Sequence, residues 1–554
     1  MMLVLLLVFL IAPAVSGQTS NTTSVPKKEE CSIAGTVVKL ADSEPLRRAR
    51  VSLWSADDRT RRISVLTDPA GHFKLQGIQP GSYHLNVNRA GFVAQEYGQK
   101  KPNDPGALLT LRSGQEMKDL LFRLIPSAVI AGKILDEDGE ALSEISVSAL
   151  RQTYLEGKPS LATEATAQTD DRGEYRLFGL SPGRYFVSAV FPQWGRFSRG
   201  DEPEEAQPNQ QGYAKMYYPG TPDASKATAI SIREGEEIPS VEIFMRQLAV
   251  FRIRGHVYNQ ITHKAGTQTE VFLMPKTRTR EWMGGEHQSL VQKQDGSFEI
   301  ADVLPGSYVL TAMWFDEGKT HSARVPIDVG NADVDSVSIA ITPGTDISGR
   351  LIWEGTPSLE QDELSVVAES PDMFNFDGGS RVTTSNTFVL KGLSDGTYMA
   401  RVWGHGKDCY VKDVQYAGSS ALEDGFAVKG GAAGTLEITL SSRGARVQGT
   451  VADSDGLRAV GVRVVLVPEP SRRAQSTLFK AQTTDQYGHF ELRGIAPGDY
   501  KLFSWEEAES GAWEDPEFLK PFEGKGEKIT LQEGDQKTIN LTAIRTKSPE
   551  SPKP

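Results

Sequence analysis

The side chains best suited to metal or acid–base chemistry in this sequence are its eight histidines, and their spacing forms no known site. They are His72, His84, His256, His263, His287, His321, His405 and His489. Neither His-Glu-x-x-His, which holds zinc in metalloproteases, nor the nucleophile motif Gly-x-Ser-x-Gly occurs. We therefore expect no catalytic residue, no metal and no cofactor.

Two acidic turns resemble the opening of a calcium-binding loop. They are Asp136-Glu-Asp-Gly139 and Asp453-Ser-Asp-Gly456. A calcium loop of this kind needs further oxygen ligands and a Glu at its twelfth position. The residues after Gly456 are Leu-Arg-Ala-Val, which carry no side-chain oxygen. We favour ordinary Asp-Gly hairpin turns at both places.

Tryptophans are the strongest candidates for ligand contacts. Trp403 and Trp505 each lie five residues after a repeated tyrosine, and Trp314 lies six residues after another. Because side chains alternate along a strand, Trp403 and Trp505 should lie on the face opposite their tyrosine, and Trp314 on the same face. An exposed ring could stack on a sugar, and Trp513 could extend such a platform. The alternative is that these rings close a module end or the joint with a neighbour.

A second candidate contact surface is a long insertion at 192–215. It is rich in Gln, Pro and charged residues, contains Trp194, and leads into Tyr217 and Tyr218. Loops of this length are functional or disordered.

One sequence motif recurs five times along the chain. Clear copies occupy 67–85, 169–187 and 484–502, and weaker copies occupy 293–310 and 384–400. The aligned positions are Gly71, Gly81 and Tyr83; Gly173, Gly183 and Tyr185; Gly296, Gly306 and Tyr308; Gly396 and Tyr398; and Gly488, Gly498 and Tyr500. A second series of glycines, one upstream of each copy, recurs at similar spacing: Gly35, Gly132, Gly255, Gly349 and Gly449. Repetition at this period predicts tandem modules.

The motif has the composition of strands joined by tight turns. Asp-x-x-Gly is turn chemistry, because Asp bonds the backbone and Gly accepts a positive φ. Pro-Gly should close the next turn with Gly in the left-handed position. The tyrosine that follows should bury its ring and offer its hydroxyl to a backbone group, as in the tyrosine corner of immunoglobulin-like sandwiches. Short alternating strands between such turns predict an all-β protein of five β-sandwich modules, arranged as beads on a string.

The two glycine and tyrosine series set the expected boundaries. We predict a signal peptide at 1–17, a linker at 18–30, modules at 31–127, 128–248, 249–344, 345–442 and 443–546, and a disordered tail at 547–554.

The first module resembles a known family. Residues 33–54, IAGTVVKLADSEPLRRARVSLW, followed by 67–92, are similar to the carboxypeptidase regulatory-like domain, a transthyretin-like sandwich. The third copy lacks the leading Thr, and the fourth has Asp395 in place of Pro. Zinc carboxypeptidases carry catalysis in a separate domain that uses His-x-x-Glu, and no histidine here has Glu three positions on. The resemblance implies an exported, non-enzymatic protein whose fold is related to carbohydrate-binding modules.

Composition limits the environment and the partners. The apolar run of residues 3–14, followed by small residues, is typical of a secretory leader, and no later run is long enough to span a membrane. Cys31 and Cys409 lie in different modules, so we expect no disulfide framework. A net charge of −12 argues against a nucleic-acid partner. We expect a secreted or periplasmic protein.

The function expected from these features is an exported, non-enzymatic binding or adhesion scaffold that contacts a glycan or a cell-surface protein through loop aromatics. The first alternative is a passive stalk or accessory protein that presents a separately encoded partner. A more remote alternative is a peptidase-associated protein. The oligomeric state is left open.

Overall fold

The computed structural model describes residues 29–546, except 57, 59, 156, 192–210, 277–287, 317–318, 357–363, 371–378 and 431–433. The predicted signal peptide, most of the linker, the tail, Trp194 and most of the insertion lie outside the described residues. The described chain is built almost wholly of β-strands, which confirms the all-β prediction. Ten of its eleven sheets form five successive pairs along the chain.

The first pair shows the topology. In its first sheet, the leading strand lies between one antiparallel and one parallel neighbour, in the order β4 (His72–Ile78), β1 (Cys31–Lys39) and β8 (Glu116–Leu124). The second sheet is antiparallel, with β3 (Arg62–Leu66), β2 (Arg50–Ser55), β5 (Gly81–Asn88), β6 (Gln95–Glu96) and β7 (Leu109–Leu111). β1 therefore pairs with one strand from the middle of residues 31–124 and with the strand at the end of that range.

The other four pairs repeat this order, with a leading strand between one antiparallel and one parallel neighbour. Their first sheets are β12 (Glu174–Leu180), β9 (Ala128–Leu135), β17 (Glu237–Ile238) and β18 (Ile243–Phe244); β21 (Lys264–Ala265), β24 (Ser297–Val303), β20 (Phe251–Asn259) and β27 (Val334–Ile341); β31 (Thr387–Leu393), β28 (Thr345–Glu354), β36 (Leu436–Ser441), β33 (Tyr410–Tyr416) and β34 (Ser419–Ser420); and β40 (His489–Ile495), β37 (Ala445–Ala452), β43 (Gln536–Thr538) and β44 (Leu541–Thr542).

The matching second sheets are also antiparallel. They are β11 (Lys158–Gln168), β10 (Ser146–Leu155), β13 (Gly183–Val190), β15 (Met216–Tyr217) and β16 (Ile230–Ile232); β23 (Gln288–Leu290), β22 (Glu270–Pro275), β25 (Gly306–Asp316) and β26 (Lys319–Val329); β30 (Gly379–Arg381), β29 (Ser365–Glu369), β32 (Gly396–Trp403) and β35 (Phe426–Val428); and β39 (Lys480–Thr483), β38 (Arg463–Pro468), β41 (Gly498–Trp505) and β42 (Glu527–Leu531).

Short elements complete the chain. β14 (Gln211–Tyr213) pairs with β19 (Gln247–Ala249), so the boundary predicted at 248 falls within a strand. The helices are η1 (Ala224–Lys226), η3 (Pro470–Arg472), η4 (Ser476–Leu478), η5 (Ala512–Glu514), α2 (Pro516–Leu519) and η6 (Lys520–Phe522). In the described residues, no helix is long and apolar enough to cross a membrane. The division into modules beyond these sheet pairs stays a prediction.

Each pair of sheets encloses its own hydrophobic core. Five clusters of buried residues follow one another along the chain, and each draws on both sheets of one pair. A sixth, smaller cluster covers the other face of the last module's second sheet. Separate cores mean that each pair can be treated as a folding unit of its own.

The upstream glycine series has a steric cause. A Cβ on Gly35, Gly132, Gly255 or Gly449 would collide with the backbone carbonyl of the parallel last strand, and one on Gly349 would collide with the ring of Phe388. The last strand thus approaches the leading strand too closely for a side chain, which explains why glycine recurs there.

The Asp-x-x-Gly turns form as predicted. Asp68 Oδ1 accepts hydrogen bonds from the backbone N–H groups of Ala70 and His72, and Gly71 has a φ of 76°. Asp485 makes the same two bonds to Tyr487 and His489.

The Pro-Gly prediction needs a correction. Gly81, Gly306 and Gly396 do not have a left-handed φ, because each begins a strand. A Cβ on Gly306 would be crowded, at 3.1 Å from Cε2 of Tyr308, whereas a Cβ on Gly81 or Gly396 would make an ordinary contact with its tyrosine at 3.5 or 3.6 Å. The left-handed residue lies four positions earlier, at Gly77 with a φ of 73°, where the pairing of β1 with β4 shifts register.

The tyrosine corner is confirmed in all five copies. Each hydroxyl donates to the carbonyl four residues upstream, at 2.6 to 2.9 Å. The five tyrosines are Tyr83, Tyr185, Tyr308, Tyr398 and Tyr500. The bond ties the strand to the turn before it, and in the second and fourth copies it pairs a buried carbonyl, that of Ser181 or Ser394.

We expect Tyr185→Phe to lower the free energy of unfolding of the second module by about 1–3 kcal/mol. The substitution leaves the carbonyl of Ser181 without its partner in a buried site. Hydrogen exchange of β12 and β13 under increasing urea measures the loss. Tyr258→Phe, at an exposed ring, is the control and should stay within about 0.5 kcal/mol of wild type. Equal effects of the two variants would contradict the role given to the corner.

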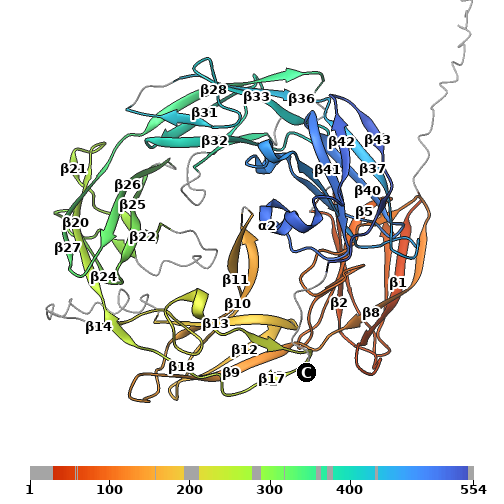
Figure 1. The fold of residues 1–554 in the computed structure, drawn as a ribbon, viewed down its shortest axis with the longest axis horizontal. Helices are drawn as coiled ribbons and strands as arrows, with labels where there is room; N and C mark the ends of the chain where they lie inside the picture. The colour runs from red at the N-terminus through yellow and green to blue at the C-terminus, as the bar shows by residue number, and fades with distance from the viewer. Residues whose placement is uncertain are drawn as a thin grey trace, which may run out of the picture.

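The sheet pairs are arranged in a ring (Figure 1). In each pair, the sheet with the leading strand lies on the outer side and the other sheet faces the middle. The β10–β11 hairpin projects into the middle toward α2. The tandem order is as predicted, but the string is closed, because the first and last modules touch (Figure 1). The beads-on-a-string picture omitted this contact, which no local pattern encodes.

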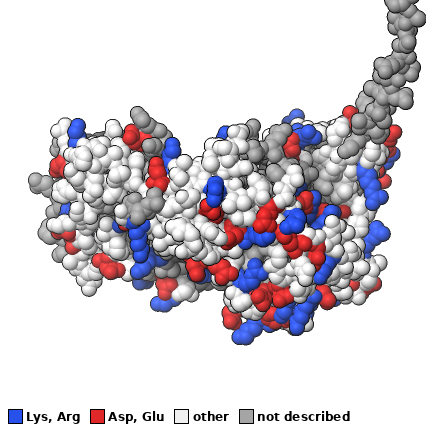
Figure 2. All heavy atoms as spheres, turned by 90° about the horizontal axis from the view of Figure 1, so that it is seen from above, with Lys and Arg blue, Asp and Glu red and all other residues white. Residues whose placement is uncertain are grey.

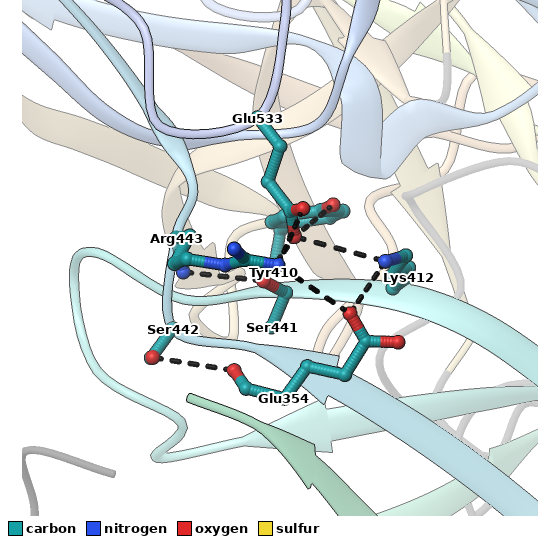
Figure 3. A network of polar contacts seen from close by, with 7 residues as sticks. All are labelled: Glu354, Tyr410, Lys412, Ser441, Ser442, Arg443 and Glu533. Atoms are coloured by element: carbon teal, nitrogen blue, oxygen red, sulfur yellow. Dashed lines mark hydrogen bonds and ion pairs between the residues drawn. The ribbon is translucent and has the colours of Figure 1, made fainter. Parts of the chain in front are cut away.

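The joint between the fourth and fifth modules is a polar network centred on Glu533 (Figure 3). Glu533 accepts hydrogen bonds from Tyr410 and Ser441 and pairs with Arg443 at 2.9 Å. These bonds, that from Ser441 foremost, hold the pKa of Glu533 below its ordinary value. Burial, with Glu533 nearby, raises the pKa of Tyr410 to about 12. Several charge-assisted bonds therefore fix this joint.

Charges of both signs are mixed on the surface. Figure 2 shows Lys and Arg interspersed with Asp and Glu over the visible face. That face carries no broad basic area of the kind that phosphate backbones require.

Candidate functional site

Trp505 and Trp513 are buried, so their rings are not available for a ligand. Trp505 is 0% exposed, stacks on Phe503 with ring centroids 4.8 Å apart, and meets the edges of Phe518 and Phe522. It lies on the face of β41 opposite Tyr500, as the odd offset predicted. The segment that contains η5, α2 and η6 covers that face. The alternative interpretation, a tryptophan that closes part of its module, describes both residues.

Trp403 and Trp314 differ from this pair and from each other. Trp403 is 59% exposed, at the end of β32. Trp314 is partly buried, packs against the core that contains Tyr308, and lies 5.5 Å from the ring of His321. Its even offset therefore does place it on the tyrosine's face. The tryptophans do not form one platform.

The second predicted surface is mostly buried where the structure describes it. Tyr217 is 6% exposed, with Lys215 over its ring, and Tyr218 packs against the second module's core. Trp194 lies outside the described residues.

The acidic residues considered as calcium ligands form turns, and the two cysteines are buried in the core. Asp136 Oδ1 accepts from the N–H groups of Asp138 and Glu140, and Asp453 makes the equivalent bonds, so both acidic sequences are Asp-Gly turns as favoured. Within the described ranges, no three His, Cys, Asp or Glu side chains are grouped closely enough to hold a metal ion. Cys31 and Cys409 are buried free thiols.

The ring closes at a seam between the first and last modules. Gln486 places its side-chain amide against Thr110, accepting from the Thr110 N–H at 3.0 Å and donating to its carbonyl at 2.6 Å. Tyr487 accepts a hydrogen bond from Gln115 and lies under the guanidinium of Arg112. Both residues belong to the Asp-x-x-Gly turn of the last module.

Two further contacts complete the seam. Lys101 of the first module pairs with Glu507, and Arg151 on β10 of the second module pairs with Glu509 at 2.9 Å. Gly98 and Gly461 meet so closely that a Cβ on Gly461 would collide with the Gly98 carbonyl. The first, second and last modules therefore meet at one place.

A cleft of about 540 Å³ opens at this seam. Its lining residues are Trp54, Ser55, Ala56, His84, Asn86, Ala94, Glu96, Gln99, Asn103, Asp104 and Pro105 of the first module, and Ser510 of the last. The volume falls in the usual range of small-molecule sites.

An aromatic pair forms part of the cleft wall. Trp54 on β2 and His84 on β5 are directly opposite across the two strands, and their rings stack 5.5 Å apart at 15°. Their neighbours Leu53 and Leu85 point into the core, so alternation turns Trp54 and His84 outward, toward the middle of the ring.

Another part of the lining is a loop that its own side chains hold in place. The Glu96 carboxylate accepts from the N–H of Gly106, and Gln99 bonds both the Glu96 N–H and the Asp104 carbonyl. Polar groups and a stacked aromatic pair thus line the same cleft. This combination can bind a ligand that has one apolar face and several hydroxyl groups.

Asp104 is the electrostatically unusual residue of the cleft. Burial, followed by the nearby charge of Glu509, raises its pKa to about 6, and Glu507 acts in the same direction. Lys101 and Arg463 oppose this rise. The sequence prediction missed both Asp104 and Trp54. The signal for Trp54 was the alternation in Val51-Ser-Leu-Trp54, which puts tryptophan on the wet face of a half-buried strand.

The comparison with family models bears on the first module. Residues 32–117 match the model of the carboxypeptidase regulatory-like domain. The first module is therefore similar to that domain. The aromatic pair and the cleft loop both lie in this module, and the last module contributes the remaining contacts.

Other comparisons add little. No curated protein sequence matches the chain. Among solved structures, the Bacillus anthracis TIE protein aligns at 13% identity over 56% of this chain and 51% of its own, with a TM-score of 0.16. GBS52, the minor pilin of Streptococcus agalactiae, aligns at 12% identity over 40% of this chain and 96% of its own, with a TM-score of 0.21. BcpA, the major pilin subunit of Bacillus cereus, aligns at 10% identity over 57% and 100%, with a TM-score of 0.14. Scores this low do not bear on function.

Proposed function

We propose that this protein is an exported, non-enzymatic binding scaffold, and that it binds carbohydrate in the cleft at the ring seam. Export is supported by the leader-like sequence at 1–17. The site differs from the one expected from the sequence, because Trp54 and His84 replace the tryptophans of the later modules.

The observation that carries the proposal is the stacked Trp54–His84 pair in a polar cleft. A sugar ring presents one apolar face of C–H groups and a rim of hydroxyls. The aromatic faces match the first, and Asn86, Gln99 and Asp104 match the second. Because the sheet fixes both rings, little ordering is needed on binding.

The alternative of a passive stalk fits less well. A stalk separates the two ends of its chain, whereas here the first and last modules are bonded to each other. A peptidase-associated role has no supporting feature beyond the family resemblance of the first module.

We expect Trp54→Ala to weaken glycan binding about tenfold or more, which corresponds to about 1.4 kcal/mol. Screening the full chain on a glycan array and titrating the best ligand by calorimetry gives the measurement. Trp403→Ala removes an exposed tryptophan from the inner sheet of another module and should leave the affinity unchanged. If no glycan binds, or if both variants bind as wild type does, the proposal is wrong.

A further inference from the structure

The described lining of the cleft carries a net negative charge. Of its described lining residues, those with a formal charge at neutral pH are Glu96 and Asp104. The groups that face Asp104 are Lys101 of its own loop and Glu507, Glu509 and Arg463 of the last module. Lys101 is paired with Glu507, and Arg463 lies 5.3 Å from the ring of Trp513. The cations near the cleft therefore already have partners.

An acidic cleft of this kind selects among sugars. It disfavours uronic acids, sialic acids and phosphorylated sugars, whose negative charge would lie beside Asp104 and Glu96. A positive charge would gain a charge-assisted hydrogen bond to either carboxylate. The same cation could lie over the face of Trp54, because an aromatic ring attracts cations to its face.

We propose that the ligand of this cleft is a saccharide that carries a free amino group, such as an oligomer of glucosamine. This inference rests on the carbohydrate-binding function proposed above. The sugar face stacks on Trp54, and the ammonium group pairs with Asp104 across the cleft. Acetylation of the amine removes its charge, so N-acetylated sugars lose the second contact.

The pH dependence of this contact has a definite sign. Because burial raises the pKa of Asp104 to about 6, its carboxyl group is largely ionised at pH 7 and largely neutral at pH 5. An amino sugar loses its ammonium proton on the alkaline side of neutrality, so the preference for the amine should be greatest near pH 7 and decline as the pH falls through 6. His84 lines the same cleft. An N-acetylated sugar, which can contact His84 but offers no ammonium group, is the control for any effect of pH on the cleft other than the ion pair.

The test is calorimetric titration of the full chain with oligomers of glucosamine, of N-acetylglucosamine and of glucose at matched length. We expect the glucosamine oligomer to bind about tenfold more tightly than the other two at pH 7, and the advantage to disappear at pH 5. Asp104→Asn should remove the advantage at pH 7, so that the variant binds the glucosamine and glucose oligomers equally. Glu96→Gln, which keeps an oxygen for the Gly106 N–H, should reduce the advantage in part.

The outcomes separate the two proposals. Equal binding of all three oligomers would overturn the amine preference and leave carbohydrate binding intact. Binding of none would overturn both. A lysine-containing peptide that binds more tightly than any oligomer and loses affinity in Trp54→Ala would assign the cleft to a cationic protein segment and overturn the saccharide. If Asp104→Asn has the thermal unfolding profile of wild type, its loss of the amine preference reflects the lost contact with the ligand and not unfolding of the cleft.

Discussion

Replacing Gln486 and Tyr487 together by alanine is expected to open the ring. The double variant removes both hydrogen bonds to the backbone of Thr110, the bond from Gln115 and the Arg112–Tyr487 contact. At about 1 kcal/mol for each of the three hydrogen bonds and about 0.5–1 kcal/mol for the cation–π contact, the closed state loses about 3.5–4 kcal/mol. That loss raises the ratio of open to closed molecules by roughly several hundredfold.

Two measurements report the opening. The radius of gyration from small-angle scattering should increase, and the amide of Thr110 should lose its protection against hydrogen exchange. The matched control is Asp171→Ala with Arg172→Ala, which changes the same two turn positions in the second module, away from the seam. A double variant with the scattering profile and exchange of wild type would show that the remaining contacts, such as Lys101–Glu507, suffice to close the ring.

Trp505→Ala is expected to destabilise the last module by about 3–5 kcal/mol. The substitution empties the centre of a cluster in which Phe503, Phe518 and Phe522 all contact the lost ring. The segment that contains α2 rests on this cluster, so it should detach in the variant. Hydrogen exchange of β38 and β41 under increasing urea isolates this module from the others.

Trp403→Ala is the natural control for this experiment. It occupies the same position of the repeat, five residues after the tyrosine, yet its ring is 59% exposed. We expect a change within about 0.5 kcal/mol in the fourth module. Comparable losses in the two variants would mean that the cluster around Trp505 adds nothing beyond what an exposed ring provides.

The fold could be predicted from sequence where the signal was local and repeated. The turns at Asp68 and Asp485, the tyrosine corners and the opposite faces of Tyr500 and Trp505 all follow from short-range rules. The glycine of the Pro-Gly pair was assigned a left-handed conformation that Gly81, Gly306 and Gly396 do not have, because each begins a strand. Glycine occurs in both turns and strand starts, so the residue type alone does not distinguish them.

The candidate site could not be predicted, because it depends on contacts between distant segments. Gln486 and Thr110 are separated by 376 positions, and nothing in either segment marks the other as its partner. Whether a tryptophan is exposed depends on what covers it: the helical segment after β41 buries Trp505, whereas Trp403 at the end of β32 is 59% exposed. Trp54 belongs to no repeated position, so a search based on the repeat passed over it.

Closure of the ring also has a consequence for assembly. A head-to-tail contact between two different surfaces produces a closed ring when the rotation brings the ends together and an open fibre when it does not. Here the turn of the last module and the strand β7 of the first are such a pair of surfaces, and they satisfy each other within one chain. A molecule that has used both surfaces on itself has neither left for another copy. Polymerisation through this contact would require exchange of end modules between chains.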